Sequence, residues 1–370
     1  MAERTKTPSW DYALILVSMS LIGLGLVMVF SSSSVLAQKR FGDPFYFFRP
    51  QIIYACLGLI LMLIARKLPY QWHCRLAYPY LLGIIILLIL VMIPGVGHRA
   101  GGASRWLRFA GISFQPSEFA KLALVFYLSY SLAAKRDKVK RFEVGLFPHL
   151  VILGVLVGLV VAEPDLGAAV ILTFIALVLF FVAGVPLSHL ISLGMLSIPV
   201  VWLAIIKYPY RMQRITAFIS PWEDPLGSGY HIIHSFLAFA SGGLFGAGPG
   251  AGTQKLFFLP ECHTDFIFSV VGEEFGFLGV ITVAFLFLVF VARGVAAALN
   301  AHDLEGTYMA MGLTLIIGLQ AFMNMAVALG LMPTKGLILP FFSYGGTAMV
   351  VNFLCLGVLL NIGAQGRLEK

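Results

Sequence analysis

Long apolar runs recur along the whole chain, and they limit its possible folds more than any other feature. A helix needs roughly 20 mostly apolar residues to cross the hydrocarbon core of a bilayer. Ten runs in this sequence come close to that length, and no soluble domain interrupts them. They cover residues 12–33, 50–66, 77–95, 117–134, 144–162, 166–183, 187–206, 266–292, 308–330 and 340–362. The sequence therefore predicts an all-α, polytopic integral membrane protein with ten transmembrane helices and one large extracytoplasmic loop.

Composition supports a membrane protein and narrows its partners. Hydrophobic residues make up 59% of the 370 residues and charged residues only 11%, too few to cover a soluble surface of this size. The formal net charge of +8 favours membrane lipids or phosphate groups as partners. No basic, aromatic-rich soluble module is present, so nucleic acid is not expected as a partner. The four cysteines lie in separate segments without metal-ligand spacing.

Basic residues predict which side of the membrane the loops face. An even number of spans places both termini on one side. The loop at residues 135–141 carries five basic residues in seven, and Arg66, Lys67 and Arg75 lie on the same side two spans earlier. Because short loops rich in Lys and Arg stay inside, both termini are predicted to be cytoplasmic.

The longest segment without an apolar run, residues 207–265, is predicted to be the large extracytoplasmic loop that carries the active site between spans seven and eight. Its basic residues include Arg211, Arg214 and Lys255. The piece HIIHSFLAFA is short and amphipathic, which predicts a position at the interface or against the bundle. GAGPGAG at 246–252 resembles a nucleotide-binding fingerprint, but no strand precedes it, so it predicts only a tight, flexible turn.

A second external loop leads into the fourth span through the motif QPSE. Its basic residues include Arg99, Arg105 and Arg108. Pro116 suits the first turn of a helix, and Glu118 lies near the positive end of the helix dipole. Glu118 and Lys121 share a face and can pair, which lowers the energetic cost of a lysine in the membrane. Two interpretations stay open, a structural ion pair or a part of the site.

Further acids lie in the EPDLG turn at 163–167 and inside the eighth span. The acids of the turn are expected to be solvated. Glu273 and Glu274 lie two turns inside the span, where an acid usually faces a cavity or a partner. Lys121 is one candidate for that partner.

If ECHTDF, within the stretch LPECHTDFIF at 259–268, begins a helix, Glu261 and Asp265 share one face directly before the eighth span. Two carboxylates suit a glycosidase, but that scheme leaves the many external arginines unexplained. Arginines bind phosphate and stabilise negative charge on a leaving group. One carboxylate base with a cationic clamp suits glycosyl transfer from a lipid pyrophosphate at the outer membrane face. Alternatively, Asp265 only caps the helix.

Four stretches resemble the SEDS family, the shape, elongation, division and sporulation proteins. In chain order they read GASRWLRFAGISFQPSEFAKL, RMQRITAFISPWEDPLGSGY, LPECHTDFIFSVVGEEFGFLG and LMPTKGLILPFFSYGGTAMV. The resemblance covers nearly the whole chain and implies a single SEDS membrane domain over residues 1–370. PTKGL before SYGG is more similar to the division members than to the elongation members.

The resemblance implies a peptidoglycan glycosyltransferase with an inverting mechanism. Such enzymes polymerise lipid II into β-1,4-linked glycan and release undecaprenyl pyrophosphate. It further implies a class B penicillin-binding protein, a transpeptidase, as partner, together with other divisome proteins. The location implied is the bacterial cytoplasmic (inner) membrane, with the active site facing outward. A divalent cation, Mg²⁺ or Mn²⁺, is implied for activity, and no organic cofactor is expected.

The predicted site follows from these motifs. Asp265 matches the aspartate of the family's HTDF motif, and the resemblance assigns it the role of general base. The predicted substrate-binding residues are Arg105, Glu118, Lys121, Arg211, Arg214, Lys255, Glu261, His263, Thr264 and Ser343. The predicted supporting residues are Gln115, Glu274 and Lys335. The metal ligands are not identified.

Some positions depart from the family pattern, and other functions stay open. His231 and His234 stand where glutamine is usual, and they could bind sugar, confer pH sensitivity or only pack. A flippase that moves a lipid-linked precursor would also suit ten spans with charges inside the membrane. However, the charges gather on one side and no inverted repeat is visible, which favours one-sided chemistry. An elongation-type polymerase and a mere scaffold for a partner are the remaining alternatives.

Overall fold

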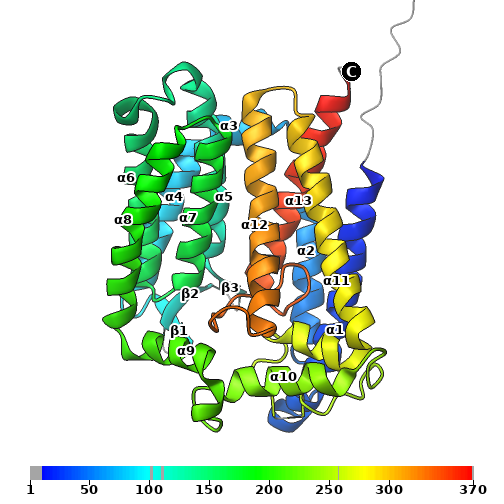
Figure 1. Cartoon of the computed structure of the whole chain (residues 1–370). Coiled ribbons are helices and arrows are strands. Elements are labelled where there is room, and N and C mark those ends of the chain that lie inside the picture. Colours follow the sequence, from blue (N-terminus) through cyan, green and yellow to red (C-terminus); the bar gives the residue numbers. More distant parts are fainter. Residues whose placement is uncertain (1–10, 101–102, 110–111, 257, 369–370) are drawn as a thin grey trace, which may run out of the picture.

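Helices fill most of the chain in the computed structural model, which describes residues 11–100, 103–109, 112–256 and 258–368 (Figure 1). The long helices run roughly parallel or antiparallel to one another. They are α1 (Tyr12–Phe41), α2 (Phe48–Lys67), α4 (Ala77–Met92), α5 (Pro116–Ala134), α6 (Phe147–Ala162), α7 (Leu166–Val182), α8 (Leu187–Ile206), α11 (Ile267–Leu299), α12 (Leu304–Ala328) and α13 (Gly346–Leu368). A short helix, α3 (Tyr70–Arg75), lies between α2 and α4.

Within the described residues, six helices are long and apolar enough to cross a membrane: α1, α2, Phe142–Ala162, α11, α12 and Gly346–Gly366. Each of the ten predicted ranges falls on a helix. The other four ranges fall on α4, α5, α7 and α8, whose apolar stretches are shorter or, in α5, interrupted by Glu118 and Lys121. The protein is therefore a polytopic helical membrane protein.

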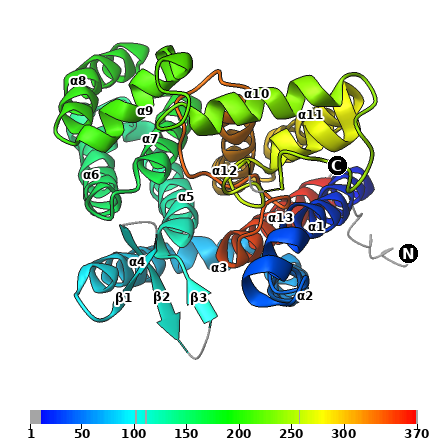
Figure 2. The same cartoon turned by 90° about the horizontal axis from the view of Figure 1, so that it is seen from below.

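The long helices form two groups that meet at α5 and α12 (Figure 2). One group contains α4, α5, α6, α7 and α8, and the other contains α1, α2, α11, α12 and α13. The most extensive contact between two helices of the described residues is that of α2 with α13. At their crossing, a Cβ added to Gly357 would lie only 2.5 Å from the Met62 carbonyl oxygen, so a glycine is required there.

One end of the bundle carries the three strands and two of the short helices (Figure 1). The start of α1, the end of α13 and the short helix α3 lie at the opposite end. The elements at the first end are β1 (Gly97–Ala100), β2 (Ala103–Phe109), β3 (Ile112–Phe114), α9 (Pro209–Ile219) and α10 (Tyr230–Gly242). The helix α10 lies across the long helices, as its amphipathic sequence predicts.

The three strands correct the all-α prediction. They form an antiparallel sheet in the order β1-β2-β3 within the loop that precedes α5. The strands contain four, seven and three residues, too few for a clear alternation of apolar and polar side chains in the sequence. The sheet gives Arg105 a fixed backbone instead of a place on a free loop.

The helix α11 breaks at Gly276, whose φ of 65° and ψ of −160° are not helical. The break frees backbone carbonyls of the preceding turn, and the glycine-rich segment after α10 hydrogen bonds to them. Ala247 N donates to Glu273 O at 2.9 Å, and Gly248 N donates to Glu274 O at 3.0 Å. The predicted flexible turn is therefore held against α11, and the glycines serve a backbone pairing that requires positive φ at Gly248.

Candidate active site

The turn that carries Asp265 occupies the last residues before α11. Glu261 adopts a left-handed backbone with φ of 52°, which is unusual for a residue with a side chain. Its carbonyl oxygen accepts from the backbone N–H groups of Thr264, Asp265 and Phe266 at 3.1, 3.1 and 3.3 Å. This tight turn places Asp265 at the entrance of α11.

Residues near α13 and from α12 hold this turn in place. The Ser343 hydroxyl donates to Thr264 O at 2.6 Å and accepts from Leu339 N at 2.8 Å. The Asn324 side-chain nitrogen donates to Asp265 O at 2.9 Å and to Leu337 O at 2.6 Å. Sequence reasoning missed Asn324, because an amide inside an apolar helix gives no sign of its partner.

The Asp265 carboxylate is left open. It is half-buried, and no described residue donates a hydrogen bond to either of its oxygens. One of those oxygens lies 3.5 Å from the position that a Cβ on Gly336 would occupy. Burial raises the pKa of Asp265 to about 7 and the Glu261 charge adds to this, whereas Arg214 and Arg105 oppose it. A carboxylate with free oxygens and a pKa near neutrality is suited to accept a proton.

Arg105 and Arg214 approach this carboxylate from two different elements. Arg105, on β2, donates from Nε to Glu163 O at 3.1 Å and from Nη2 to Pro164 O. Arg214, on α9, is exposed and donates to Thr334 O at 3.4 Å. Both guanidiniums therefore remain positive charges within electrostatic reach of Asp265.

Arg211 lies one helical turn before Arg214 but is buried. Its Nε donates to the Tyr210 hydroxyl at 2.9 Å, and its guanidinium carbon lies 4.3 Å from the centre of the Tyr208 ring. Aromatic rings thus enclose much of this cation. The pairs of basic and aromatic residues on α9 follow from their spacing on one short amphipathic helix.

The predicted pairing of Glu118 with Lys121 is confirmed. Their charged atoms are 2.8 Å apart, and Lys121 is fully buried among the helices. Gln320 from α12 joins the pair, with its amide oxygen towards the Lys121 ammonium in the orientation that satisfies both groups. In the described residues, no hydrogen bond or ion pair joins these groups to Asp265.

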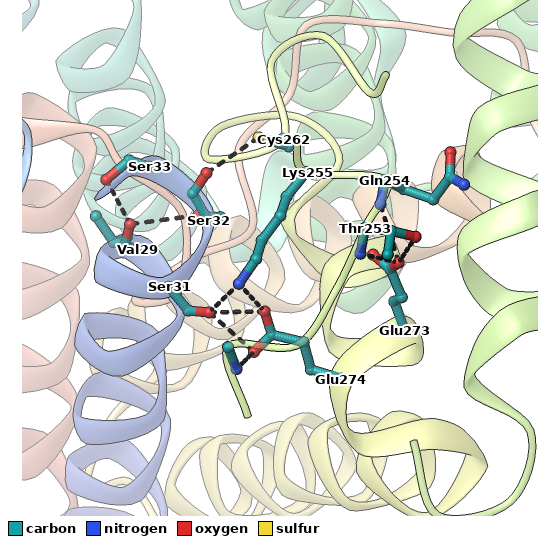
Figure 3. Close-up of polar contacts among 11 residues, drawn as sticks. Val29, Ser31, Ser32, Ser33, Thr253, Gln254, Lys255, Cys262, Glu273 and Glu274 are labelled. Carbon is teal, nitrogen blue, oxygen red and sulfur yellow. Dashed lines mark hydrogen bonds and ion pairs between the residues drawn. The ribbon is translucent and has the colours of Figure 1, made fainter. Parts of the chain in front are cut away.

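Glu274 has its partners in α1 and in the segment after α10 (Figure 3). Its carboxylate accepts from Lys255 Nζ at 2.6 Å, from Ser31 Oγ at 2.6 and 2.9 Å, and from Gly250 N at 3.0 Å. Lys255 also donates to Ser31 at 2.9 Å. The hypothesis that Lys121 is the partner is therefore wrong, because the glycine-rich segment folds back along α11 and brings Lys255 to the acid.

Glu273 is held by the same segment through one carboxylate oxygen, whereas its other oxygen has no hydrogen-bond partner among the described residues (Figure 3). One carboxylate oxygen accepts from Thr253 N at 2.5 Å, from Thr253 Oγ1 at 3.1 Å and from Gln254 N at 2.9 Å. Both intramembrane acids thus anchor the segment that leads to the Asp265 turn. Since Lys255 is buried in this network, its ammonium already has partners within the protein.

The acids of the EPDLG turn are buried, so the expectation that they are solvated is wrong. Glu163 is 1% exposed and Asp165 is 6% exposed. Asp165 caps α7 by accepting from Ala168 N at 3.0 Å. The α6–α7 turn also contacts Arg105, which lies on a segment far from it in the sequence.

The remaining predicted residues surround these groups. His263 is buried between the rings of Phe47 and Tyr344, with centroids at 4.6 and 5.9 Å, and burial lowers its pKa. The Glu261 carboxylate accepts from the Thr264 hydroxyl at 3.0 Å. Lys335 is half-buried, and burial lowers its pKa.

Gln115 and the two histidines of α10 make contacts within the protein. Gln115 N donates to Thr347 Oγ1 at 3.2 Å. His234 shares a hydrogen bond of 2.8 Å with Gln254, and the His231 ring stacks on Phe266 at 5.8 Å. These contacts favour packing and positioning for the two histidines.

In the part of the chain that the structure describes, no group of three or more His, Cys, Asp or Glu is arranged to hold a metal ion. These residues therefore do not form a protein-only site for Mg²⁺ or Mn²⁺. The requirement for a divalent cation stays a prediction.

Known proteins are similar to this chain over nearly its whole length. A family of cell cycle proteins that is named for FtsW, RodA and SpoVE matches residues 12–368. A probable peptidoglycan glycosyltransferase FtsW from Geobacter sp. (strain M18) is 45% identical, covering 98% of this chain and 99% of the relative. The stage V sporulation protein E of Bacillus subtilis is 40% identical, covering 98% of this chain and 99% of the relative.

Solved structures are similar over the same length. One chain, from a study of structural coordination of polymerization and crosslinking by a peptidoglycan synthase complex, is similar with a TM-score of 0.78 and 30% identity. The match covers 96% of this chain and 98% of that chain. The rod shape determining protein RodA of Thermus thermophilus is similar with a TM-score of 0.72 and 29% identity, covering 96% and 97% of the two chains.

Proposed function

The chain belongs to the FtsW, RodA and SpoVE family of cell cycle proteins, and we propose that it is a peptidoglycan glycosyltransferase that polymerises lipid II during bacterial cell division. Relatives named FtsW are 45–47% identical over nearly the full chain. The observation within the site that carries the proposal is the open Asp265 carboxylate, which has raised pKa and lies within reach of two arginines.

In the proposed reaction, Asp265 acts as the general base. It takes the proton from the 4-hydroxyl of the acceptor sugar as that oxygen attacks the anomeric carbon of the donor. The bond from this carbon to the pyrophosphate breaks, and undecaprenyl pyrophosphate leaves with the electron pair. Attack opposite to the α-linked leaving group inverts the configuration and yields a β-1,4 bond.

The arginines serve the leaving group. Pyrophosphate gathers negative charge as the bond breaks, and positioned guanidiniums stabilise such charge in a partly desolvated site. Arg105 and Arg214 are suited to this role because their present partners are carbonyl oxygens, which do not cancel their charge. The same charges oppose the upward pKa shift of Asp265 and help to keep the base ionised.

The topology is part of the proposal. We place ten spans in the membrane, both termini in the cytoplasm and Asp265 at the outer face of the bacterial cytoplasmic membrane. Support comes from the common end at which α1 begins and α13 ends, and from the basic turn Arg136–Lys138 that follows α5. A lipid-anchored substrate presents its sugar just outside the bilayer, which is where a base at the entrance of α11 would meet it.

A class B penicillin-binding protein is the proposed partner, because a polymerised strand needs a transpeptidase to crosslink it. The similarity to a chain of a peptidoglycan synthase complex, whose study concerns polymerisation and crosslinking, supports this partner. The identity to relatives named FtsW supports division rather than elongation.

Polymerisation of labelled lipid II by the purified protein tests the function. The assay would run with and without the cognate transpeptidase and with Mg²⁺ or Mn²⁺. Glu223→Gln is the matched control, since Glu223 is an exposed acid and no side-chain hydrogen bond or ion pair of the described residues joins it to the site. Glycan chains from wild type and from this control, but not from Asp265→Asn, would support the proposal. Transport of lipid II across vesicles without polymerisation would support a flippase instead.

A further inference from the structure

The α6–α7 turn holds Arg105 through backbone carbonyl oxygens and not through a carboxylate. The guanidinium donates to the backbone carbonyl oxygens of Glu163 and Pro164, from Nε and from Nη2. A guanidinium carries five N–H donors, so three remain for another partner. Because neutral carbonyls accept the two bonds, the positive charge of Arg105 is not cancelled.

The carboxyl group of Glu163 belongs to the same turn but does not pair with this cation. Its side chain is 1% exposed, and neither carboxyl oxygen has a hydrogen-bond partner among the described residues. No ion pair between described residues includes Glu163. An ionised carboxylate buried without partners would be strongly unfavourable, so this geometry indicates a neutral acid.

The charges around Glu163 agree with a neutral acid. Burial raises the pKa of Glu163 to about 8, and Asp165 on the same turn adds to this. Arg105 from β2 opposes the shift. Near neutral pH the acid therefore keeps its proton, although Arg105 is a neighbour.

We propose that Glu163 is a positioning residue for the glycosyl transfer: as a neutral acid it lets the α6–α7 turn hold Arg105 by carbonyl oxygens, so that the guanidinium charge stays available to the pyrophosphate. This inference rests on the proposed function. Ionised Glu163 would form an ion pair with Arg105, draw the guanidinium from the two carbonyls and cancel its charge. Glutamine at position 163 cannot ionise and would keep the productive arrangement at every pH.

The pH dependence of lipid II polymerisation tests this role. The wild-type rate is expected to fall about fivefold between about pH 8 and about pH 9, as Glu163 ionises. Glu163→Gln should keep its rate over this interval, whereas the control Glu223→Gln should decline like wild type. If Glu163→Gln fails to fold, Glu163→Met offers another side chain of similar length that cannot ionise.

A second readout does not depend on activity. Glu163 has a higher pKa in the folded than in the unfolded protein, so folding binds a proton and the stability from this group is lost as pH rises through the folded pKa. The Tm of wild type relative to Glu163→Gln should therefore fall between about pH 5 and about pH 8 and then level off.

Two failures are distinguishable. A folded wild-type protein that does not polymerise lipid II would overturn the proposed function. An active wild type whose alkaline decline persists in Glu163→Gln would overturn the positioning role alone. A Tm difference that does not change with pH would likewise overturn it, because Glu163 would then not be held neutral.

Discussion

Asp265 and Glu274 lie close together in the sequence, yet the protein treats these two acids in opposite ways. The Glu274 carboxylate accepts from three donors, Ser31, Lys255 and Gly250, and the Ser31 hydroxyl lies within hydrogen-bond distance of both of its oxygens. The Asp265 carboxylate accepts none from the described residues. The comparison separates an acid that completes the fold from an acid that is kept open for a substrate.

Location explains the difference. Glu274 is buried inside α11, where an unpaired charge would be strongly unfavourable, and its partners therefore come from α1 and from the segment after α10. Asp265 lies before α11 and retains some solvent contact, so it can remain unpaired. The network around Glu274 in turn holds the segment that leads to Asp265 (Figure 3).

The largest effect is expected at the open acid. Asp265→Asn should lower lipid II polymerisation by about a thousandfold, because the variant has no base of comparable strength. Its Tm in detergent near neutral pH should be at least that of wild type, since no described side chain bonds to this carboxylate and Asn removes an acid whose pKa burial raises. Full activity of the purified variant would contradict the assignment of Asp265 as the base.

The second-largest effect is expected at Glu274, the paired acid, and it concerns the stability of the fold. Glu274→Gln leaves the Lys255 ammonium buried without a counter-charge, which should lower the free energy of unfolding by about 3 kcal/mol. Thermal or denaturant unfolding in detergent would measure it. The double variant Lys255→Met, Glu274→Gln removes both charges and should recover most of the loss. A single variant as stable as wild type would show that the pair does not matter to the fold.

The pH dependence of the polymerisation rate tests whether the open acid, Asp265, acts as the base. Asp265 must be deprotonated to act as base, and its pKa of about 7 means that the active fraction grows as pH rises. The polymerisation rate should therefore rise about six- to eightfold between about pH 6 and about pH 7.5. A rate that is flat over this interval, measured with saturating lipid II, would argue against an Asp265 base with this pKa.

The smallest effect is expected at Ser343, which was predicted to bind substrate. Its hydroxyl donates to Thr264 O and accepts from Leu339 N, so both bonds are within the protein. Ser343→Ala should lower the free energy of unfolding by about 1 kcal/mol and reduce the rate only slightly. A large rise in the KM for lipid II at unchanged stability would instead support substrate contact.

Much of the fold follows from the sequence because a membrane helix is a local structure. Every backbone group of such a helix is satisfied within its own segment, so length and apolar character are sufficient signals. The range predicted for the seventh span, 187–206, coincides with α8 (Leu187–Ile206). The three short strands were missed because their pairing depends on neighbouring segments rather than on one local pattern.

The site was only partly predictable for the same reason. Glu118 and Lys121 are three residues apart on one helix, so their pairing was visible in the sequence. Ser31 and Glu274 are 243 residues apart, and Lys255 reaches Glu274 only because the intervening segment folds back. The contact of Arg105 with the α6–α7 turn also joins distant segments.

The sequence by itself determined that the chain is a helical membrane protein, and its motifs identified Asp265 as the acid of interest. Only the tertiary structure decided which acids are satisfied and which stay open. Whether a carboxylate is paired depends on side chains that other helices bring to it, and burial then determines its pKa. Asp265 differs from Glu274 through these surroundings, which no local stretch of sequence contains.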